Sequence, residues 1–465
     1  MHTLRLRLSG LLIAFAAAAA LACAGEVHYD ADQDLLWVVG FPEEAPATPQ
    51  TLLEADERNG WGQVMYLEEL DVYTVGAELW IGDDETYGTY FQVGDAQHPK
   101  VTLAVNGTVW VRPPRESPAR TDGLPSINNR LTLGDPQDSS IQAALEIGCK
   151  TRGEHGVYVG LRPRKIEDWD TDVLRRGSIW VYNSTITAET KSKDHLWGTR
   201  DRTDEINPGW YASDVRLVNA TLSWFEGCPT YGFDSGERDR DEGLEGIEPD
   251  PLFRVRDSTF EHGGTALQNG TYYLRGCTFR DLEVGIREGG SLDALVLESV
   301  FEDNRHNVTS GGSSGGGVML VDCEVGDQEE PLLLRKNETD PRQLVSRGKP
   351  VYPAVTLREP LVVKVLDPEG EPVADAMLTV SCDKYPDAVS RGATLTDAEG
   401  LTPASVDQAV LVNTRVYRAT DDPDKIEETT YTYRVSVTAA GFPAQTVTVD
   451  SARGVPEPLV VRLAK

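Results

Sequence analysis

The sequence is poor in cysteine for its length, and the spacing of its cysteines excludes two common uses of the residue. Six cysteines stand among 465 residues, and no two of them form a Cys-x-x-Cys pair. Zinc sites and the disulfide frameworks of small secreted domains both require closely spaced cysteines. We therefore interpret the five cysteines that follow Cys23 as small buried hydrophobic residues.

Basic residues are also scarce, which disfavours polyanionic partners. Lysine and arginine total 44 against 75 aspartates and glutamates, so the formal net charge is −31. Such a surface repels nucleic acid and anionic lipid. This balance suits an extracellular protein and counts against a strongly anionic polysaccharide as its ligand.

Long apolar runs are confined to the N-terminus. Leu11–Ala22 is almost unbroken, follows two arginines, and precedes the small residues of Ala22-Cys23-Ala24. This is the pattern of a signal peptide, so we predict that residues 1–24 are removed and that the mature chain has no transmembrane segment. Cys23 leaves lipoprotein anchoring open as an alternative. In both cases the predicted location is secreted or extracellular, at the cell surface.

Between residues 178 and 326 one pattern occurs six times. Each copy has a branched aliphatic residue two positions before a central residue, a small residue one position after it, and a large apolar residue three positions after it. The central residues are Asn183, Asn219, Asp257, Gly276, Glu298 and Asp322. The last three intervals, of 19, 22 and 24 residues, have the length of one coil of a solenoid.

The apolar residues alternate on both sides of each central residue, but the phase of the alternation changes across it. Alternation predicts strands, and the change of phase means that one residue turns a corner without a loop. Such a corner favours the left-handed backbone region, which Asn, Asp and Gly tolerate. We therefore predict positive φ at Asn183 and Asn219, and local strain or a different corner at Glu298. The same alignment places Ser299 between Cys277 and Cys323, too far apart for a disulfide.

The repeat resembles the right-handed parallel β-helix of the pectin-lyase-like superfamily, over about residues 67–330. A third strand, such as Ala266–Gly270, completes each coil. The expected fold class is all-β: a right-handed parallel β-helix solenoid over residues 67–345, with residues 25–66 as an N-terminal cap. In that cap, Thr51–Glu54 has the capping-box pattern of a short helix reaching about Arg58. An antiparallel sandwich or propeller is the alternative.

After residue 355 the pattern changes to short strands separated by turns. Leu361–Leu366, Ala376–Cys382 and Tyr431–Thr438 are expected strands, and their spacing favours a small β-sandwich. Together with the turn Thr396-Asp-Ala-Glu-Gly400, these segments resemble the carboxypeptidase-regulatory-like domain, an immunoglobulin- or transthyretin-like sandwich. The resemblance implies an accessory domain over residues 355–465, with no peptidase activity.

The β-helix resemblance transfers no catalytic residue. Hydrolases of this fold use paired carboxylates, and lyases use a base with calcium or arginine, but the polygalacturonase-like motifs are absent as a set. The acidic insertion 235–251 is interpreted as a solvated loop, with a calcium site as the alternative. No other cofactor or metal is expected.

The third strand of each coil offers a candidate ligand-binding strip. Phe233, Leu267, Ile286 and Val308 are predicted to point inward, so the residues that follow them point outward. The strip and its flanking turns comprise Asp234, Gln268, Arg287, Glu288, His262 and His306. A carboxylate, a histidine and an arginine within reach of one another suit acid–base chemistry on a sugar, or hydrogen bonding to one.

Two functions follow as hypotheses. The first is a non-catalytic glycan-binding or structural platform at the cell surface. The second is a polysaccharide lyase or glycoside hydrolase that acts along the outer wall of the β-helix. The missing motifs favour the first, because a fold without a recognised site leaves its chemistry open.

Overall fold

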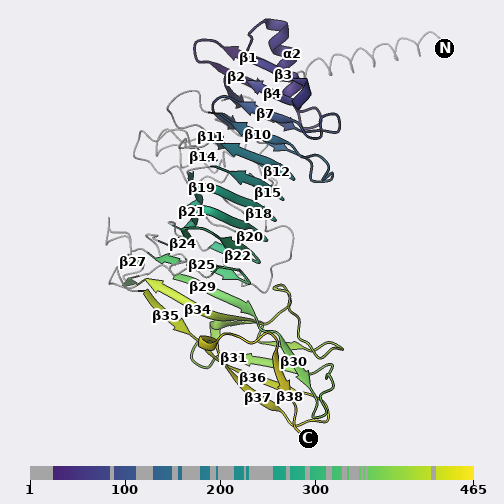
Figure 1. The fold of residues 1–465 in the computed structure, drawn as a ribbon, viewed down its shortest axis with the longest axis vertical. Coiled ribbons are helices and arrows are strands. Elements are labelled where there is room, and N and C mark those ends of the chain that lie inside the picture. Colours follow the sequence, from purple (N-terminus) through teal and green to yellow (C-terminus); the bar gives the residue numbers. More distant parts are fainter. Residues whose placement is uncertain are drawn as a thin grey trace, which may run out of the picture. The chain divides into compact units, whose positions relative to one another are not determined.

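The computed structural model of the protein describes the chain in segments and divides it into two compact units. The N-terminal unit ends at Phe233 and the C-terminal unit begins at Asp234. Figure 1 labels the elements of both. The described residues are 25–83, 88–111, 129–148, 156–159, 178–188, 195–196, 214–224, 227–229, 255–268, 273–288, 294–310, 317–326, 332–334, 345–346, 349–350, 354–419 and 426–465.

The protein is all-β, with large parallel sheets, and the described residues contain a single α-helix, α2 (Pro49–Asn59). The expected helix is therefore confirmed, but its predicted start is wrong. Thr48 is the N-cap and forms the capping box with Thr51, because Pro49 suits the first helical position and lets the helix begin three residues earlier. No helix in the described segments is long and apolar enough to cross a membrane.

Three columns of parallel strands make up most of the N-terminal unit. The first column consists of β4 (Val72–Val75), β7 (Thr102–Val105), β10 (Ala144–Ile147), β13 (Thr185–Ala188) and β16 (Thr221–Ser223). The second consists of β2 (Leu35–Val39), β5 (Glu78–Ile81), β8 (Val109–Val111), β11 (Gly156–Val159), β14 (His195–Leu196) and β17 (Gly227–Pro229). The third consists of β6 (Tyr90–Val93), β9 (Arg130–Leu133), β12 (Ser178–Tyr182) and β15 (Asp214–Val218).

The chain visits the columns in the order first, second, third, and then returns to the first. Two antiparallel strands flank them: β1 (Glu26–Asp30) pairs with β2, and β3 (Val64–Leu67) pairs with β4 and leads into the 3-10 turn η1 (Glu68–Leu70). The expected cap segment 25–66 therefore also supplies β2, a member of the second column.

The C-terminal unit repeats this parallel arrangement. One column of strands consists of β18 (Val255–Arg256), β20 (Tyr273–Arg275), β22 (Ala294–Leu297), β25 (Gly317–Val321) and β29 (Ala354–Pro360). A second group of parallel strands pairs within itself. It consists of β19 (Thr259–Gln268), β21 (Thr278–Glu288), β23 (Val300–Glu302), β24 (His306–Ser310) and β26 (Leu332–Leu334). A short hairpin joins β27 (Val345–Ser346) and β28 (Lys349–Pro350).

The one-residue corners are confirmed at all six central residues of the repeat. Their φ angles lie between 48° at Glu298 and 64° at Gly276. Glu298 therefore turns the same corner as the asparagines, although left-handed backbone is uncommon for glutamate. The expected inward positions are buried on both sides of the corner, as at Val296 and Phe301.

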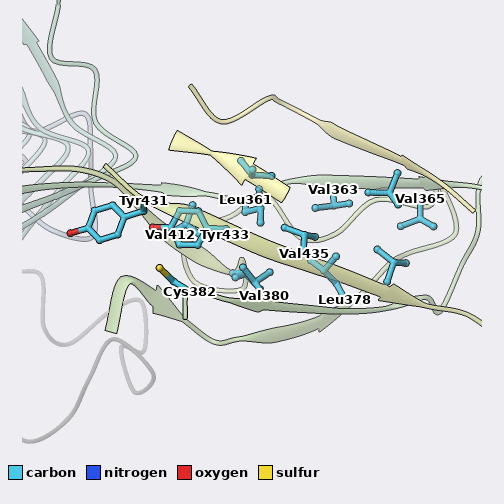
Figure 2. Packing of buried hydrophobic residues seen from close by; sticks show 14 of the residues in the cluster. Leu361, Val363, Val365, Leu378, Val380, Cys382, Val412, Tyr431, Tyr433 and Val435 are labelled. Carbon is cyan, nitrogen blue, oxygen red and sulfur yellow. The ribbon is translucent and has the colours of Figure 1, made fainter. Parts of the chain in front are cut away.

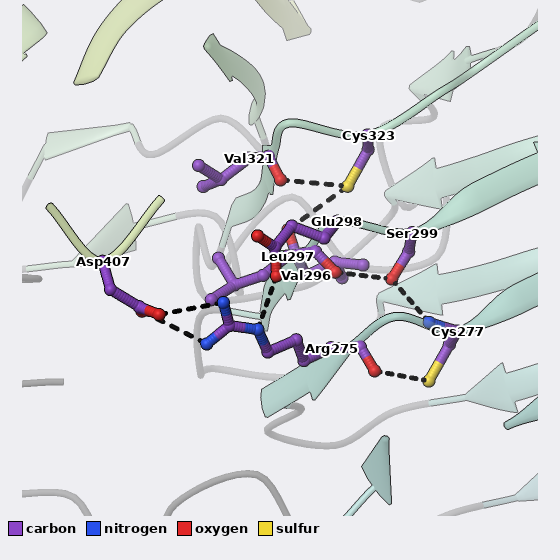
Figure 3. Close-up of polar contacts among 9 residues, drawn as sticks. All are labelled: Arg275, Cys277, Val296, Leu297, Glu298, Ser299, Val321, Cys323 and Asp407. Carbon is purple, nitrogen blue, oxygen red and sulfur yellow. Dashed lines mark hydrogen bonds and ion pairs between the residues drawn. The ribbon is translucent and has the colours of Figure 1, made fainter. Parts of the chain in front are cut away.

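Hydrogen bonds across the corner explain why the residue after it is small. The hydroxyl of Ser299 donates to the carbonyl of Leu297 (2.8 Å) and accepts from the amide of Cys277 (3.0 Å). Ser184 and Ser258 make the same bond to the carbonyl two residues before them. The Cys323 thiol contacts the Val321 carbonyl at 3.4 Å in the equivalent geometry (Figure 3).

The register places Ser299 between Cys277 and Cys323, as predicted. Both thiols are free, and burial raises the pKa of each to about 12. Their role as small apolar residues at the corner follows from that burial. Inside the same unit, Phe260, Phe279 and Phe301 stack in register, with successive ring centroids 5.1 and 4.7 Å apart.

A second set of one-residue corners lies five positions after the first and escaped the sequence analysis. His262, Asp281 and Asp303 align between neighbouring strands, and their φ angles are 55°, 51° and 53°. Just beyond them, Asn304 is buried and donates to the Phe279 carbonyl (2.8 Å). The chain therefore bends here without an open loop, and the buried Asn304 amide satisfies a main-chain carbonyl beside the bend.

After β29 the C-terminal unit becomes mainly antiparallel. One sheet has the order β33-β31-β36-β37, β30 pairs with β38, and β34 pairs with β29, β32 and β35. The strands are β30 (Val363–Leu366), β31 (Met377–Ser381), β32 (Val389–Ser390), β33 (Ala393–Leu395), β34 (Leu411–Ala419), β35 (Ile426–Thr430), β36 (Thr432–Thr438), β37 (Gln445–Asp450) and β38 (Leu459–Arg462). The 3-10 turns are η4 (Pro386–Ala388) and η5 (Ser451–Arg453).

One apolar core joins these strands. Figure 2 shows Leu378, Val380 and Val435 facing Val363 and Val365, with Tyr433 and then Tyr431 toward one end. The Tyr433 hydroxyl donates to the carbonyl of Asn413 (2.5 Å), so the ring's only polar group is satisfied inside the core. The expected strands over 361–366, 376–382 and 431–438 are confirmed within one or two residues.

The antiparallel part is joined to the parallel column rather than simply following it. β29 pairs in parallel with β25 on one side and antiparallel with β34 on the other. The predicted domain boundary at residue 355 therefore falls inside a strand that belongs to both parts.

Candidate functional site

The predicted strip follows the backbone register that the sequence analysis proposed. Leu267, Ile286 and Val308 align and are fully buried. The next positions, Gln268, Arg287 and Thr309, align in turn. Asp234 lies outside the described residues. For Gln268, Arg287 and Glu288 the description stops at the backbone, so the strip as a ligand site stays a prediction.

The two predicted histidines have different surroundings. His262 sits on a second-set corner, and its Nδ1 lies 2.7 Å from Oδ2 of Asp281. His306 aligns with the buried residue Val284, and its own Nδ1 is buried with no hydrogen-bond partner among the described residues. The structure therefore places His262 beside a carboxylate at the surface, but it does not bring the two histidines together.

Charged residues surround His262, and they neutralise one another. Arg280 lies between Glu261 and Glu302 in the register. Its Nε is 2.7 Å from Oε2 of Glu261, and that hydrogen bond raises the pKa of the guanidinium. An acid–base pair needs a carboxylate that is available to its substrate, whereas Glu261 is held by Arg280.

No metal centre is found in the part of the chain that the structure describes. Within it, no group of three or more His, Cys, Asp or Glu side chains is placed to hold an ion. The acidic insertion 235–251, where calcium was the alternative, lies outside the described residues.

The N-terminal unit carries an aromatic ladder that the sequence analysis missed. Trp37, Trp80 and Trp110 are in register on β2, β5 and β8, and Tyr158 continues the row on β11. The residues on either side of each tryptophan are buried, so the indoles face the outside of the second column, and each is partly exposed. The Trp80 and Trp110 ring centroids are 4.9 Å apart, with planes at 76°.

At the N-terminal end of this aromatic ladder an imidazole extends the row of rings. His28, on β1, stacks on Trp37 with ring centroids 5.4 Å apart. The sequence does contain a signal for the ladder: an aromatic residue between two aliphatic residues occurs as Leu36-Trp-Val38, Leu79-Trp-Ile81, Val109-Trp-Val111 and Val157-Tyr-Val159. The intervals of 43, 30 and 48 residues hide that signal, because loops of different length separate the strands.

Two outward aromatic rings on the third column, Tyr90 and Trp180, contact arginines. The Arg130 guanidinium carbon lies 4.6 Å from the Tyr90 ring centroid and 3.7 Å from that of Trp180. The Arg216 guanidinium carbon also lies over Trp180, 4.2 Å from its ring centroid. Cation–π contacts of this kind stabilise the stacked strands. The Tyr90 and Trp180 rings are therefore engaged by the protein's own cations.

Comparisons with protein-family models, with curated proteins and with solved structures returned no match.

Proposed function

We propose that the protein is an exported, non-catalytic glycan-binding platform, built as a right-handed parallel β-helix followed by a small β-sandwich. The observation that carries the proposal is the aromatic ladder of Trp37, Trp80 and Trp110. In this proposal residues 1–24 form a signal peptide and the mature chain is secreted. In the alternative, cleavage falls before Cys23, which then carries the lipid that holds the chain at the cell surface.

The fold proposal draws on the parallel columns and the corners. Successive strands of a column align, and single left-handed residues replace some of the loops between columns. Short aligned strands joined by such tight corners are expected in a solenoid. The sandwich proposal draws on the four-stranded sheet and the β30–β38 pair, which share one apolar core. In this proposal the cap spans residues 25–66, the β-helix spans residues 67–345 and the sandwich spans residues 355–465.

The aromatic ladder suits a sugar chain for two physical reasons. Aromatic rings present flat apolar surface with a polar edge, which matches the amphipathic faces of a pyranose ring. Successive rings stand about one strand spacing apart, about 4.8 Å, so several contacts act on one extended ligand. The net charge of −31 disfavours polyanions, and we therefore propose a neutral polysaccharide as the ligand.

The second candidate is a polysaccharide lyase or glycoside hydrolase that acts along the outer wall. The contact between His262 and Asp281 favours it, because a carboxylate that orients an imidazole is a common arrangement for a general base. The pairing of Glu261 with Arg280 counts against it, since the Glu261 carboxylate is then engaged by a guanidinium instead of a substrate.

Affinity electrophoresis through gels that contain neutral glucans, mannans or xylans tests the platform. We expect at least one neutral polysaccharide to retard the protein, and the double variant Trp80→Leu with Trp110→Leu to weaken that binding by about tenfold. Trp180→Leu is the matched control, because it removes an indole from the third column and should leave retardation unchanged. Equal retardation of the double variant and the parent protein would contradict the proposal.

Turnover separates the two candidates. The same polysaccharides, together with polygalacturonate, are incubated with the protein and assayed for new reducing ends and for unsaturated-uronate absorbance. The platform predicts neither product. Activity that disappears in His262→Ala, with the fold intact, would establish the enzyme instead.

A further inference from the structure

A groove of about 600 Å³ lies on the first column of the N-terminal unit, separate from the strands of the aromatic ladder. Its floor is a single row of outward side chains that crosses five strands in register. The row consists of Met65 on β3, Thr74 on β4, Ala104 on β7, Glu146 on β10 and Thr187 on β13. Four strand spacings make the row about 19 Å long, which suits an extended ligand rather than a compact one.

The groove offers hydrogen-bonding groups and one charge. Among the described residues that line it, Glu146 alone carries a formal charge. The side-chain amides of Gln63 and Asn106 and the hydroxyls of Thr74 and Thr187 are also in the lining. The neighbours of Glu146 in the row, Ala104 and Thr187, are small, so the exposed carboxylate is accessible from both directions along the groove.

The floor does not suit an extended peptide as the occupant. Peptides that bind to sheets add a strand at a free edge and are held by main-chain hydrogen bonds. Each of the floor strands β4, β7, β10 and β13 has a paired neighbour on both sides, so its main-chain groups are used within the sheet. Polar recognition in this groove therefore falls to side-chain hydroxyls, amides and the carboxylate, which are the groups that bind a polyhydroxylated ligand.

We propose that this groove binds an amino-sugar oligosaccharide. A protonated amino substituent of the sugar donates to the carboxylate of Glu146, and the sugar hydroxyls hydrogen-bond to the flanking amides and threonines. A hydrogen bond between opposite charges contributes more than a neutral one. The net charge of −31 also concentrates cations near the protein and repels anions. The site differs in position and in ligand charge from the aromatic ladder, so each can be present without the other.

Isothermal titration with an oligomer of glucosamine, at a mildly acidic pH that keeps its amines protonated, tests the assignment. The fully N-acetylated oligomer of the same length is the ligand control. We expect the glucosamine oligomer to bind at least about tenfold more tightly, and Glu146→Gln to remove that preference. Glu57→Gln is the matched protein control, because Glu57 is exposed on α2 outside the groove. It removes the same charge and should leave the affinity for both oligomers unchanged.

A second variant and a second ligand complete the test. Ala104→Leu places bulk on the floor beside Glu146 without altering charge. It should weaken binding of the glucosamine oligomer, whereas Trp180→Leu, on the third column, should not. Equal affinity for the two oligomers, equal losses in Glu146→Gln and Glu57→Gln, or no binding at all would each overturn the assignment. Tighter binding of a lysine-containing peptide of equal charge would overturn the sugar as the ligand. Loss of binding to neutral polysaccharide in the ladder variants bears only on the platform proposal.

Discussion

The outward faces of the third column in the N-terminal unit and of the corresponding column in the C-terminal unit carry opposite chemistry. On β9, β12 and β15 the outward residues include Arg130, Trp180 and Arg216, which stack on one another. On β22 and β25 they are apolar, and the apolar segment before β34 covers them. That cluster consists of Leu295, Leu297 and Val321 against Val406, Ala409 and Leu411. The outward side chains of the two columns therefore differ with what lies over each strand, whereas the inward side chains are mainly apolar in both columns.

Polar contacts fix the cover in place at its edge. Arg275 binds Asp407 through both terminal nitrogens (3.2 and 2.9 Å) and Glu298 through Nε (2.5 Å), as Figure 3 shows. Burial lowers the pKa of Arg275, but hydrogen bonds to the two carboxylates more than compensate and raise it. Together with the β25–β29 pairing, these contacts make the antiparallel part a structural neighbour of the last parallel strands, not only an accessory joined by a linker.

The largest expected effect comes from placing a charge under the cover. Leu297→Asp buries a carboxylate among apolar residues and should lower the free energy of unfolding by about 3–5 kcal/mol. Trp180→Asp is the matched change on the uncovered face. It should cost about 1–2 kcal/mol, because Arg130 and Arg216 are there to pair with the new carboxylate. Urea denaturation measures both, and similar losses would remove the distinction between the two faces.

A middle-sized effect tests what the two units share. Both turn their corners with one left-handed residue, so Asn219→Val should cost about 1–3 kcal/mol through backbone strain. Asn219 also donates to Oδ1 of Asn183 (3.0 Å), a bond that valine cannot make. Asn219→Asp keeps the tolerance for positive φ and is the control. A valine variant as stable as the aspartate variant would show that the corner imposes no constraint on residue type.

The smallest expected effect concerns charge at a corner of the C-terminal unit. Desolvation, followed by repulsion from Glu298, raises the pKa of Asp322 above its ordinary value. A raised carboxyl pKa means that stability is lost as pH rises through the folded-state pKa. Asp322→Asn should therefore be slightly more stable than the parent near neutral pH, and equal to it below about pH 3, where the aspartate is protonated in both states. Thermal melts across that range measure the difference, and a variant that is less stable at neutral pH would contradict it.

Local pattern was enough to predict the repeat because its signals are short-range. The corners at Asn183 and Asn219, the buried Leu267, Ile286 and Val308, and most strands after residue 360 follow from alternation and from backbone preference. The start of α2 was misplaced because two threonines compete as caps and Pro49 decides between them. The second set of corners was missed because its positions share no residue type: Trp224, five residues after Asn219, also has positive φ (69°), beside one histidine and two aspartates.

The candidate sites depend on neighbours that sequence distance does not reveal. Residues that stack on adjacent parallel strands are separated by loops of variable length, so Trp80 and Trp110, or Ala104 and Glu146, share no fixed spacing. The strip built on Arg287 was chosen from the most regular part of the repeat, whereas the aromatic ladder and the groove lie where the repeat is irregular.

The sequence by itself determined the strands, the inward face and the corners, because alternation and left-handed backbone are properties of a few consecutive residues. Tertiary structure alone decided which outward residues became a ladder, a groove floor or a covered surface. Most inward positions are apolar because they are removed from water, and the serines that follow the corners have their hydroxyls satisfied by hydrogen bonds. The role of an outward position depends instead on what the rest of the chain places above it.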